Sequence, residues 1–232
     1  TSGYSFKEWK GNFYPADLPE REMLAFYARE LPAVEINYTF RHLPSPKTIE
    51  GWVAATPPEF TIVLKASQRI THIQRLKNAG ESARTFLDLA SGLGPKLGPV
   101  LFQLPPSMRK DAVRLTDFLT DLPPSGRYAF EFRDPSWYDD EITGILRTHG
   151  ATLCIAESED GAPPPLTVTA PFLYVRLRLE SYSDEAIRDW GERLARVVDQ
   201  GVEVYAFFKH EAAGPRYARA LLGAAAAAGA GR

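Results

Sequence analysis

The sequence predicts one (β/α)₈ TIM barrel, an α/β fold with a parallel eight-stranded core, on the basis of three observations. Short apolar segments of strand length alternate with longer amphipathic segments along the 232 residues. This alternation is typical of parallel strands covered by helices, because a parallel connection must be long enough to hold a helix. The length suits one barrel, and no linker-like change in composition divides the chain. We therefore expect one domain over residues 1–232.

The apolar segments give seven strands inside the chain, and residues 1–3 are interpreted as the end of an eighth, since a loop rich in Tyr, Trp and Gly follows them. The seven strands are expected at residues 34–37, 61–65, 100–103, 128–133, 152–157, 172–178 and 202–208. Helices are expected at residues 20–31, 45–55, 82–93, 109–122, 139–149, 183–199 and 214–228.

Two segments depart from the helical pattern. Residues 160–171 contain Pro163, Pro164 and Pro165 in succession, and proline removes backbone donors and clashes with the preceding helical turn. This stretch predicts a Pro-rich loop that replaces the sixth helix. The Ala- and Gly-rich residues 224–232 are expected to fray into a tail without a chemical role.

Composition excludes several classes of protein. The 27 basic and 29 acidic residues nearly balance, so no global field draws the chain to nucleic acid or to an anionic membrane. A single cysteine permits neither an intramolecular disulfide nor a multi-cysteine metal centre. No apolar run approaches the roughly 20 residues that span a bilayer. We expect a cytoplasmic protein that does not bind membranes and has no secretory signal.

Charged residues gather at the predicted carboxyl ends of the strands. Side chains alternate across a strand, so Glu35 and Asn37 share the inward face when Val34 and Ile36 face the helices. The same reasoning gives an upper ring with carboxylates, amides and cations: Glu35, Glu131, Glu157, Asn37, Gln103, Lys65, Arg133, Arg176 and Arg178. A barrel that is apolar below and polar at its last inward positions is typical of a site in the upper layer.

Loop residues extend this candidate site. Lys209 precedes the last helix, where the loops of many barrels bind phosphate. Tyr4 and Trp137 lie in loops at the same end and have rings that can stack on a base or a sugar. His72, in the loop after the third predicted strand counted from residue 1, completes the expected ligand-binding set.

The ring admits three interpretations. Its charges can merely neutralise one another, although buried pairs are often no more stabilising than apolar packing. Three carboxylates with His210 can suggest a divalent metal, but the interleaved cations would repel it, so we assign no metal ligand and expect no cofactor. Arginine suits bidentate contact with phosphate or carboxylate, which favours an anionic ligand.

Several motifs occur in order along nearly the whole chain. They include Thr1-Ser2-Gly3-Tyr4, Val34-Glu35-Ile36-Asn37, Glu131-Phe132-Arg133 with Pro135-Ser136-Trp137, and Tyr174-Val175-Arg176-Leu177. In these motifs the chain resembles the YecE-like family, known as domain of unknown function 72. The resemblance implies a barrel of the xylose isomerase-like type with no established reaction.

The chain departs from the family pattern at three places. Members usually carry His-Gly after the seventh-strand arginine and an Asn/Asp-containing segment after the eighth strand. Here those places hold Arg178-Leu179 and Lys209-His210-Glu211, and Glu157 stands where the family pattern leads us to expect aspartate.

The leading hypothesis is an enzyme acting on a phosphorylated or otherwise anionic small molecule. Glu131 or Glu35 would serve as general base, and Lys65, Arg133 and Arg176 would hold the anion. The reaction class stays open among hydrolase, lyase and isomerase. The alternatives are a nucleic-acid binding or processing protein like the barrel endonucleases, suggested by basic and aromatic loops, and a non-catalytic binding module, suggested by the departures from the family pattern.

Overall fold

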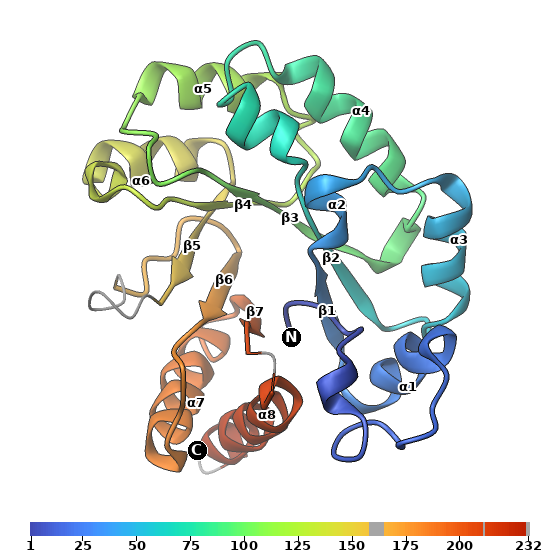
Figure 1. Ribbon diagram of the computed structural model, residues 1–232. Coiled ribbons are helices and arrows are strands. Elements are labelled where there is room, and N and C mark those ends of the chain that lie inside the picture. Colours follow the sequence, from blue (N-terminus) through green and yellow to red (C-terminus); the bar gives the residue numbers. More distant parts are fainter. Residues whose placement is uncertain (158–164, 211, 231–232) are drawn as a thin grey trace.

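The computed structural model of the chain describes residues 1–157, 165–210 and 212–230 (Figure 1). Its sheet has the order β1-β2-β3-β4-β5-β6-β7, all neighbouring pairs are parallel, and helices lie around its outside (Figure 1). The strands are β1 (Ala33–Ile36), β2 (Thr61–Lys65), β3 (Leu97–Gln103), β4 (Tyr128–Glu131), β5 (Thr152–Ala156), β6 (Phe172–Leu177) and β7 (Glu203–Phe208). The described strands form a nearly closed parallel α/β barrel, which confirms the prediction of a TIM-barrel-like parallel fold.

The amino-terminal segment connects the two ends of the sheet. Ser2 forms a single parallel bridge with Glu35 of β1, so the described residues contain seven strands where the sequence predicts eight. The Glu35 backbone N–H donates to the Thr1 carbonyl (3.0 Å), and the Ser2 N–H donates to the Phe208 carbonyl of β7 (2.9 Å). These two bonds place Ser2 between β1 and β7.

The predicted helices are present with shifts of a few residues at their ends, and one short helix that was not predicted, α2, follows β1. The helices are α1 (Met23–Glu30), α2 (Tyr38–Arg41), α3 (Pro46–Ala54), α4 (Gly80–Ser91), α5 (Ala112–Asp121), α6 (Asp140–Thr148), α7 (Asp184–Val198) and α8 (Gly214–Ala230). Four begin after a capping side chain that accepts a backbone N–H three residues later: Ser45, Asp111, Asp139 and Ser183. Such caps satisfy donors that the first turn leaves free.

The two segments of unusual composition have different outcomes. Residues 158–164, which include the first five residues of the expected Pro-rich loop, lie outside the described residues, and residues 165–171 form neither helix nor strand. At the other end, α8 continues to Ala230 through most of the segment expected to fray, so this helix is longer than predicted.

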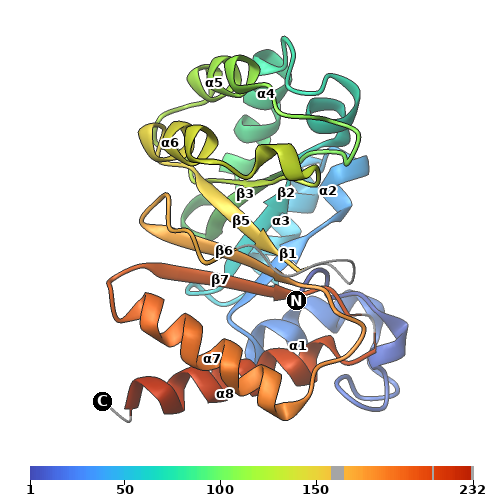
Figure 2. The same cartoon turned by 90° about the vertical axis from the view of Figure 1, so that its left-hand side faces the viewer.

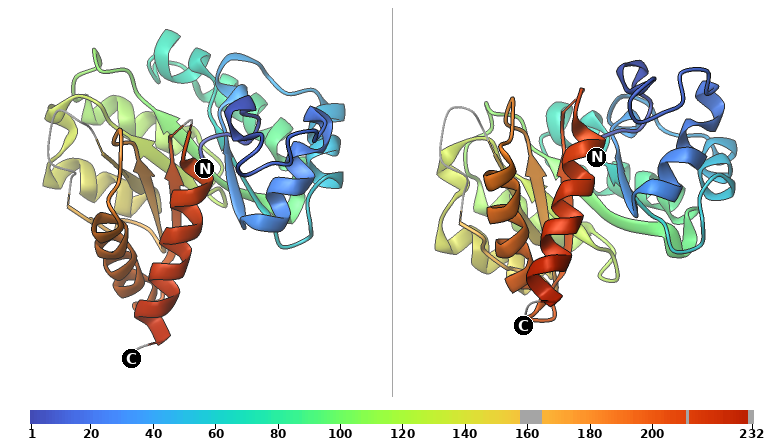
Figure 3. Two further views of the ribbon diagram at one scale, coloured as in Figure 1. Left: turned by 60° about the horizontal axis from the view of Figure 1, so that its bottom comes forward. Right: turned by 90° about the horizontal axis from the view of Figure 1, so that it is seen from below.

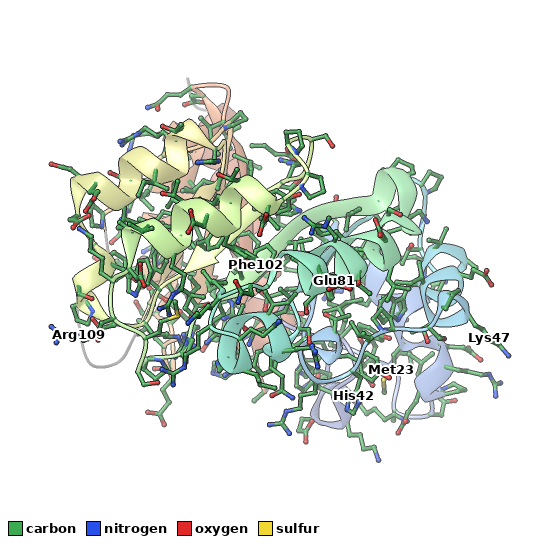
Figure 4. The ribbon with its side chains drawn as sticks, turned by 90° about the horizontal axis from the view of Figure 1, so that it is seen from above. Met23, His42, Lys47, Glu81, Phe102 and Arg109 are labelled. Atoms are coloured by element: carbon green, nitrogen blue, oxygen red, sulfur yellow. The ribbon has the colours of Figure 1, made fainter. Side chains whose placement is uncertain are left out.

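Two apolar layers hold the barrel together. One lies between the sheet and the helices and includes Phe102, which Figure 4 places well inside the molecule while Lys47 and Arg109 project from opposite edges. The other fills the barrel below the predicted ring and includes Val63, Leu101, Ala129, Cys154, Tyr174 and Phe207. Burial raises the pKa of the Cys154 thiol, so this side chain packs as a neutral group.

Helices α7 and α8 pack side by side below β6 and β7 (Figures 2 and 3). A Cβ atom on Gly191 of α7 would come within 2.6 Å of the Ala224 Cβ of α8, so the close approach requires glycine there. Of the helices in the described ranges, none is both long and apolar enough to cross a membrane.

Candidate functional site

A buried arginine joins two carboxylates from different sides of the barrel. Arg176 on β6 donates through Nη2 to Glu35 Oε1 on β1 (2.8 Å) and through Nη1 to Glu131 Oε2 on β4 (2.5 Å). The two glutamates are 0% exposed and the arginine 2% exposed. Alternation along three strands therefore brings three residues of the predicted ring into direct contact.

The carboxylate of Glu35 is fully engaged. Besides Arg176, it accepts hydrogen bonds from the Ser2 hydroxyl (2.6 Å), the Tyr174 hydroxyl (2.6 Å) and the Asn37 amide (3.2 Å). Burial would raise the pKa of this carboxyl, but Arg176 and the hydroxyl donors hold it below its usual range. Glu35 therefore stays ionised.

Glu131 is held by three arginines. Its Oε1 accepts from Arg133 Nε (2.7 Å) and Arg178 Nη1 (3.1 Å), while Oε2 accepts from Arg176. Burial opposes ionisation, yet Arg176, Arg133 and Arg178 together lower the pKa of Glu131 to about 2. A carboxylate with this pKa is a weak base and has little tendency to accept a proton at neutral pH, which argues against the predicted role of general base. We call Glu35, Glu131, Arg133, Arg176 and Arg178 the arginine–glutamate cluster.

A cavity of about 490 Å³ opens at the carboxyl ends of the strands, over this cluster. It brings together seven of the predicted residues: Asn37, Lys65, His72, Gln103, Arg133, Arg176 and Lys209. Neither Glu35 nor Glu131 lines it, and its described lining residues include no aspartate or glutamate. Five lining residues carry cationic side chains: Arg41, Lys65, Arg133, Arg176 and Lys209. We call this space the cationic cavity.

Lys65, the last residue of β2, lies in the wall of the cationic cavity. Its Nζ atom lies 4.1 Å from the centre of the Phe40 ring, and the His72 ring packs edge-on against the same phenyl ring at 4.9 Å. Burial and the charge of Arg176 lower the pKa of Lys65 to about 8. Burial and nearby cations, Lys65 first among them, also lower the pKa of His72.

Glu157 does not join the cluster, which corrects the prediction. β5 ends at Ala156, and its interior face carries Cys154 and Ala156, so the next residue faces the opposite side. The Glu157 carboxylate accepts hydrogen bonds from the Trp190 indole of α7 (2.9 Å) and the Tyr182 hydroxyl. Its contacts are those of a buried residue that links β5 to α7.

The two aromatic residues expected at the site lie elsewhere. Trp137 is 1% exposed, stacks on Phe132 at 4.5 Å and donates through its indole nitrogen to the Met108 carbonyl (2.7 Å). It is a packing residue, and the prediction that it contacts ligand is wrong for this structure. Tyr4 lines a neighbouring, mostly apolar cavity with Trp52 and not the cationic cavity.

Sequence reasoning missed several residues of this region. Tyr174 lies two residues before Arg176, so the alternation that predicted Arg176 and Arg178 also indicates its inward direction. The role of Ser2 left no such signal, because it depends on where the amino-terminal segment lies beside β1. Arg41 enters the cavity from α2, a short helix that the sequence analysis did not predict.

The described ranges contain no group of three or more His, Cys, Asp and Glu side chains arranged to hold a metal ion. Glu157 is turned away, and His210 donates through Nε2 to the Glu180 carbonyl (2.7 Å) while its Nδ1 accepts the Ala213 N–H (2.9 Å). The carboxylates that remain, Glu35 and Glu131, already have arginine partners.

Fold and site together define a parallel α/β-barrel protein with a cationic cavity above a buried arginine–glutamate cluster. The family described as "Protein of unknown function DUF72" matches residues 1–231, and the chain belongs to this family. The YecE-like family identified from the sequence motifs is thereby confirmed.

Relatives agree with this assignment. The chain is 24% identical to the UPF0759 protein YunF of Bacillus subtilis (strain 168) over 88% of its own length and 86% of that protein. The crystal structure of a DUF72 family protein from Thermotoga maritima matches with a TM-score of 0.79 and 26% identity over 96% of both chains. A DUF72 family protein from Enterococcus faecalis V583 matches with a TM-score of 0.75 and 21% identity over 88% of both chains.

Proposed function

We propose that this protein binds an anionic small molecule, a phosphate ester or a carboxylate, in the cationic cavity. The observation that carries the proposal is the separation of charges at the site. The carboxylates of the arginine–glutamate cluster lie beneath the cavity with their oxygens already bonded, while cations line the cavity itself. A ligand that enters would meet positive charge without a competing carboxylate from the described lining residues.

Charges in this region do not balance. Two carboxylates, Glu35 and Glu131, stand against six cationic side chains: Arg41, Lys65, Arg133, Arg176, Arg178 and Lys209. Arg41 and Lys209 are exposed, but Lys65, Arg133, Arg176 and Arg178 are buried or partly buried and still outnumber the two carboxylates. This part of the excess is costly, because like charges repel strongly where water is scarce. An anionic ligand would relieve this repulsion, which supports binding over a purely structural ion network.

Donors for the anion are available in the cavity wall. Arg176 uses both terminal nitrogens on the glutamates, and its buried Nε has no hydrogen-bond partner among the described atoms. Arg133 uses Nε on Glu131, and its side chain remains 29% exposed. An unpaired buried donor costs free energy, and a bound oxyanion that reaches Arg176 Nε would recover it.

Thermal unfolding with inorganic phosphate, sulfate and acetate at low ionic strength tests the proposal. We expect phosphate to raise the melting temperature of the wild-type protein and of Lys47→Gln, which removes a distant exposed charge. The same additions should stabilise Lys209→Gln and Arg133→Gln much less, because each removes a cation from the cavity wall.

Equal stabilisation of all four proteins by phosphate would contradict the proposal. So would preferential binding of an oligonucleotide with a steep loss of affinity in salt, which would instead assign the cavity to nucleic acid. Turnover of a bound anion would make the protein an enzyme, and binding without turnover of any offered anion would make it a binding module. The cavity accounts for recognition in either case.

A further inference from the structure

Lys65 differs from Lys96 and Lys110 in that its side chain forms no ion pair and no hydrogen bond with any residue that the structure describes. Lys96 donates to the Val53 carbonyl (2.7 Å) and the Thr56 carbonyl (2.5 Å), and Lys110 forms ion pairs with two acidic residues. Lys65 Nζ instead lies over the ring of Phe40, 4.1 Å from its centre. The Lys65 amine therefore lies in the cavity wall without a hydrogen bond to another described residue.

Charged groups on several elements face Lys65, and they do not favour its ammonium form. Arg176 of β6 and Arg133 after β4 oppose the charge, whereas Glu35 and Glu131 favour it more weakly than burial and Arg176 oppose it. His72 also lies nearby, and the pKa of its own ring is lowered by burial and by Lys65. Glu35 and Glu131 cannot fully offset the effects of burial and of the cations on the Lys65 ammonium group, because arginines already bind both carboxylates.

This environment changes the state of the amine at neutral pH. With a pKa of about 8, close to a tenth of Lys65 is uncharged at pH 7, against roughly three parts in ten thousand for an ordinary lysine. Only the uncharged amine is a nucleophile. A lysine desolvated beside other cations is a recurrent way to obtain one near neutrality.

We propose that Lys65 is a nucleophilic amine that forms an imine with a carbonyl compound bound in the cationic cavity. The inference rests on the proposed function, since the negative group of the ligand would be held by Arg133 and the free Nε of Arg176. The substrate class is thereby narrowed to an aldehyde or ketone that carries a carboxylate or phosphate. Lys65 then acts on the ligand covalently and does not serve only as a cation that holds it.

The step balances without an oxidant or reductant. The Nζ lone pair attacks the carbonyl carbon, the C=O π electrons move to oxygen, and proton transfer from nitrogen to oxygen gives a neutral carbinolamine. Loss of water, with one further proton taken up, leaves a protonated imine whose positive charge lies over the Phe40 ring. His72 packs against the same ring, and its lowered pKa keeps the imidazole uncharged and able to carry these protons.

Reductive trapping tests the proposal. The protein is incubated with glyoxylate, a small aldehyde that carries a carboxylate, and cyanoborohydride, which reduces an imine to a stable secondary amine. Peptide mass spectrometry then measures the extent of modification of each lysine. At pH 7 we expect Lys65 to be modified at least about tenfold faster than the exposed Lys47, because far more of it is uncharged. Inorganic phosphate should slow the modification of Lys65 and leave that of Lys47 unchanged.

Two further measurements separate this proposal from the proposed function. Lys65→Arg keeps the charge but lacks the amine, so it should still be stabilised by phosphate and should lose only the fast modification. The pH profile of wild-type labelling needs no variant and should rise to half of its maximum near pH 8.

Each outcome bears on one proposal or on both. Phosphate binding by the wild-type protein together with modification of Lys65 no faster than that of Lys47 would overturn the imine and leave anion binding intact. A labelling profile with its midpoint near that of an ordinary lysine would also overturn the imine. Failure of phosphate to bind or to protect Lys65 would count against anion binding itself.

Discussion

Replacing Arg176 by methionine removes the buried guanidinium that joins Glu35 to Glu131 and leaves a side chain of comparable length. The consequences differ for the two carboxylates. Glu131 retains Arg133 and Arg178 as cationic partners. Glu35 retains hydrogen bonds from neutral groups but loses its only ion pair in the described structure.

The expected magnitude follows from this difference. Removing one partner of a buried ion pair destabilises a protein by about 3–5 kcal/mol, because a charge is left uncompensated. The same replacement at Arg133, whose side chain is 29% exposed and whose partner keeps two other arginines, should cost about 1 kcal/mol or less. Adding Glu35→Gln to Arg176→Met removes the isolated charge and should recover about 2 kcal/mol.

Urea denaturation followed by circular dichroism at pH 7 and pH 5 measures these differences. Without Arg176 the pKa of Glu35 rises above its value in the unfolded chain, so folding takes up a proton and the loss of stability should be smaller at pH 5 than at pH 7. Equal losses for Arg176→Met and Arg133→Met, or a larger loss at pH 5, would refute the description of Arg176 as the buried bridge of this cluster.

Three other predictions concern residues around the site. The cluster lowers the pKa of Glu131 from 4.5 to about 2, which adds about 3 kcal/mol to the free energy of unfolding above pH 4.5. This contribution is lost as the pH falls toward 2, so Glu131→Gln should flatten this part of the pH profile of stability measured in urea. Glu157→Gln places an amide opposite the donors of Trp190 and Tyr182 and should cost about 1–3 kcal/mol while leaving phosphate binding intact; weakened phosphate binding would return Glu157 to the site. Trp137→Phe should cost about 1 kcal/mol by losing a buried hydrogen bond, and calorimetry should show unchanged phosphate affinity, whereas a changed affinity would restore the ligand-binding role.

Strand periodicity predicted much of the site. Alternation with a period of two placed Glu35, Lys65, Glu131 and Arg176 on the inward face, and the structure brings these residues together at one end of the barrel. Glu157 was assigned to the wrong face, because Cys154 and Ala156 of β5 face the barrel interior and alternation therefore turns the next residue toward the helices.

Strand periodicity could not predict which charged residues pair with one another. Arg176 meets Glu35 across 141 residues of sequence, and only the closure of the sheet decides which carboxylate an inward arginine reaches. Loop residues were harder still. Trp137 and Tyr4 follow strands and suit ligand contact by composition, but a short turn buries the first against Phe132 and the second lines another cavity.

The central claim is that the cationic cavity binds an anion above a cluster whose carboxylates are already neutralised. A crystal structure of the protein soaked with inorganic phosphate tests it most directly. We predict a tetrahedral anion within hydrogen-bond distance of Lys65 Nζ, the Arg133 guanidinium and Arg176 Nε, with Glu35 and Glu131 still bonded to arginine. A cation coordinated by those two carboxylates, or a cavity that holds water alone at saturating phosphate, would contradict the claim.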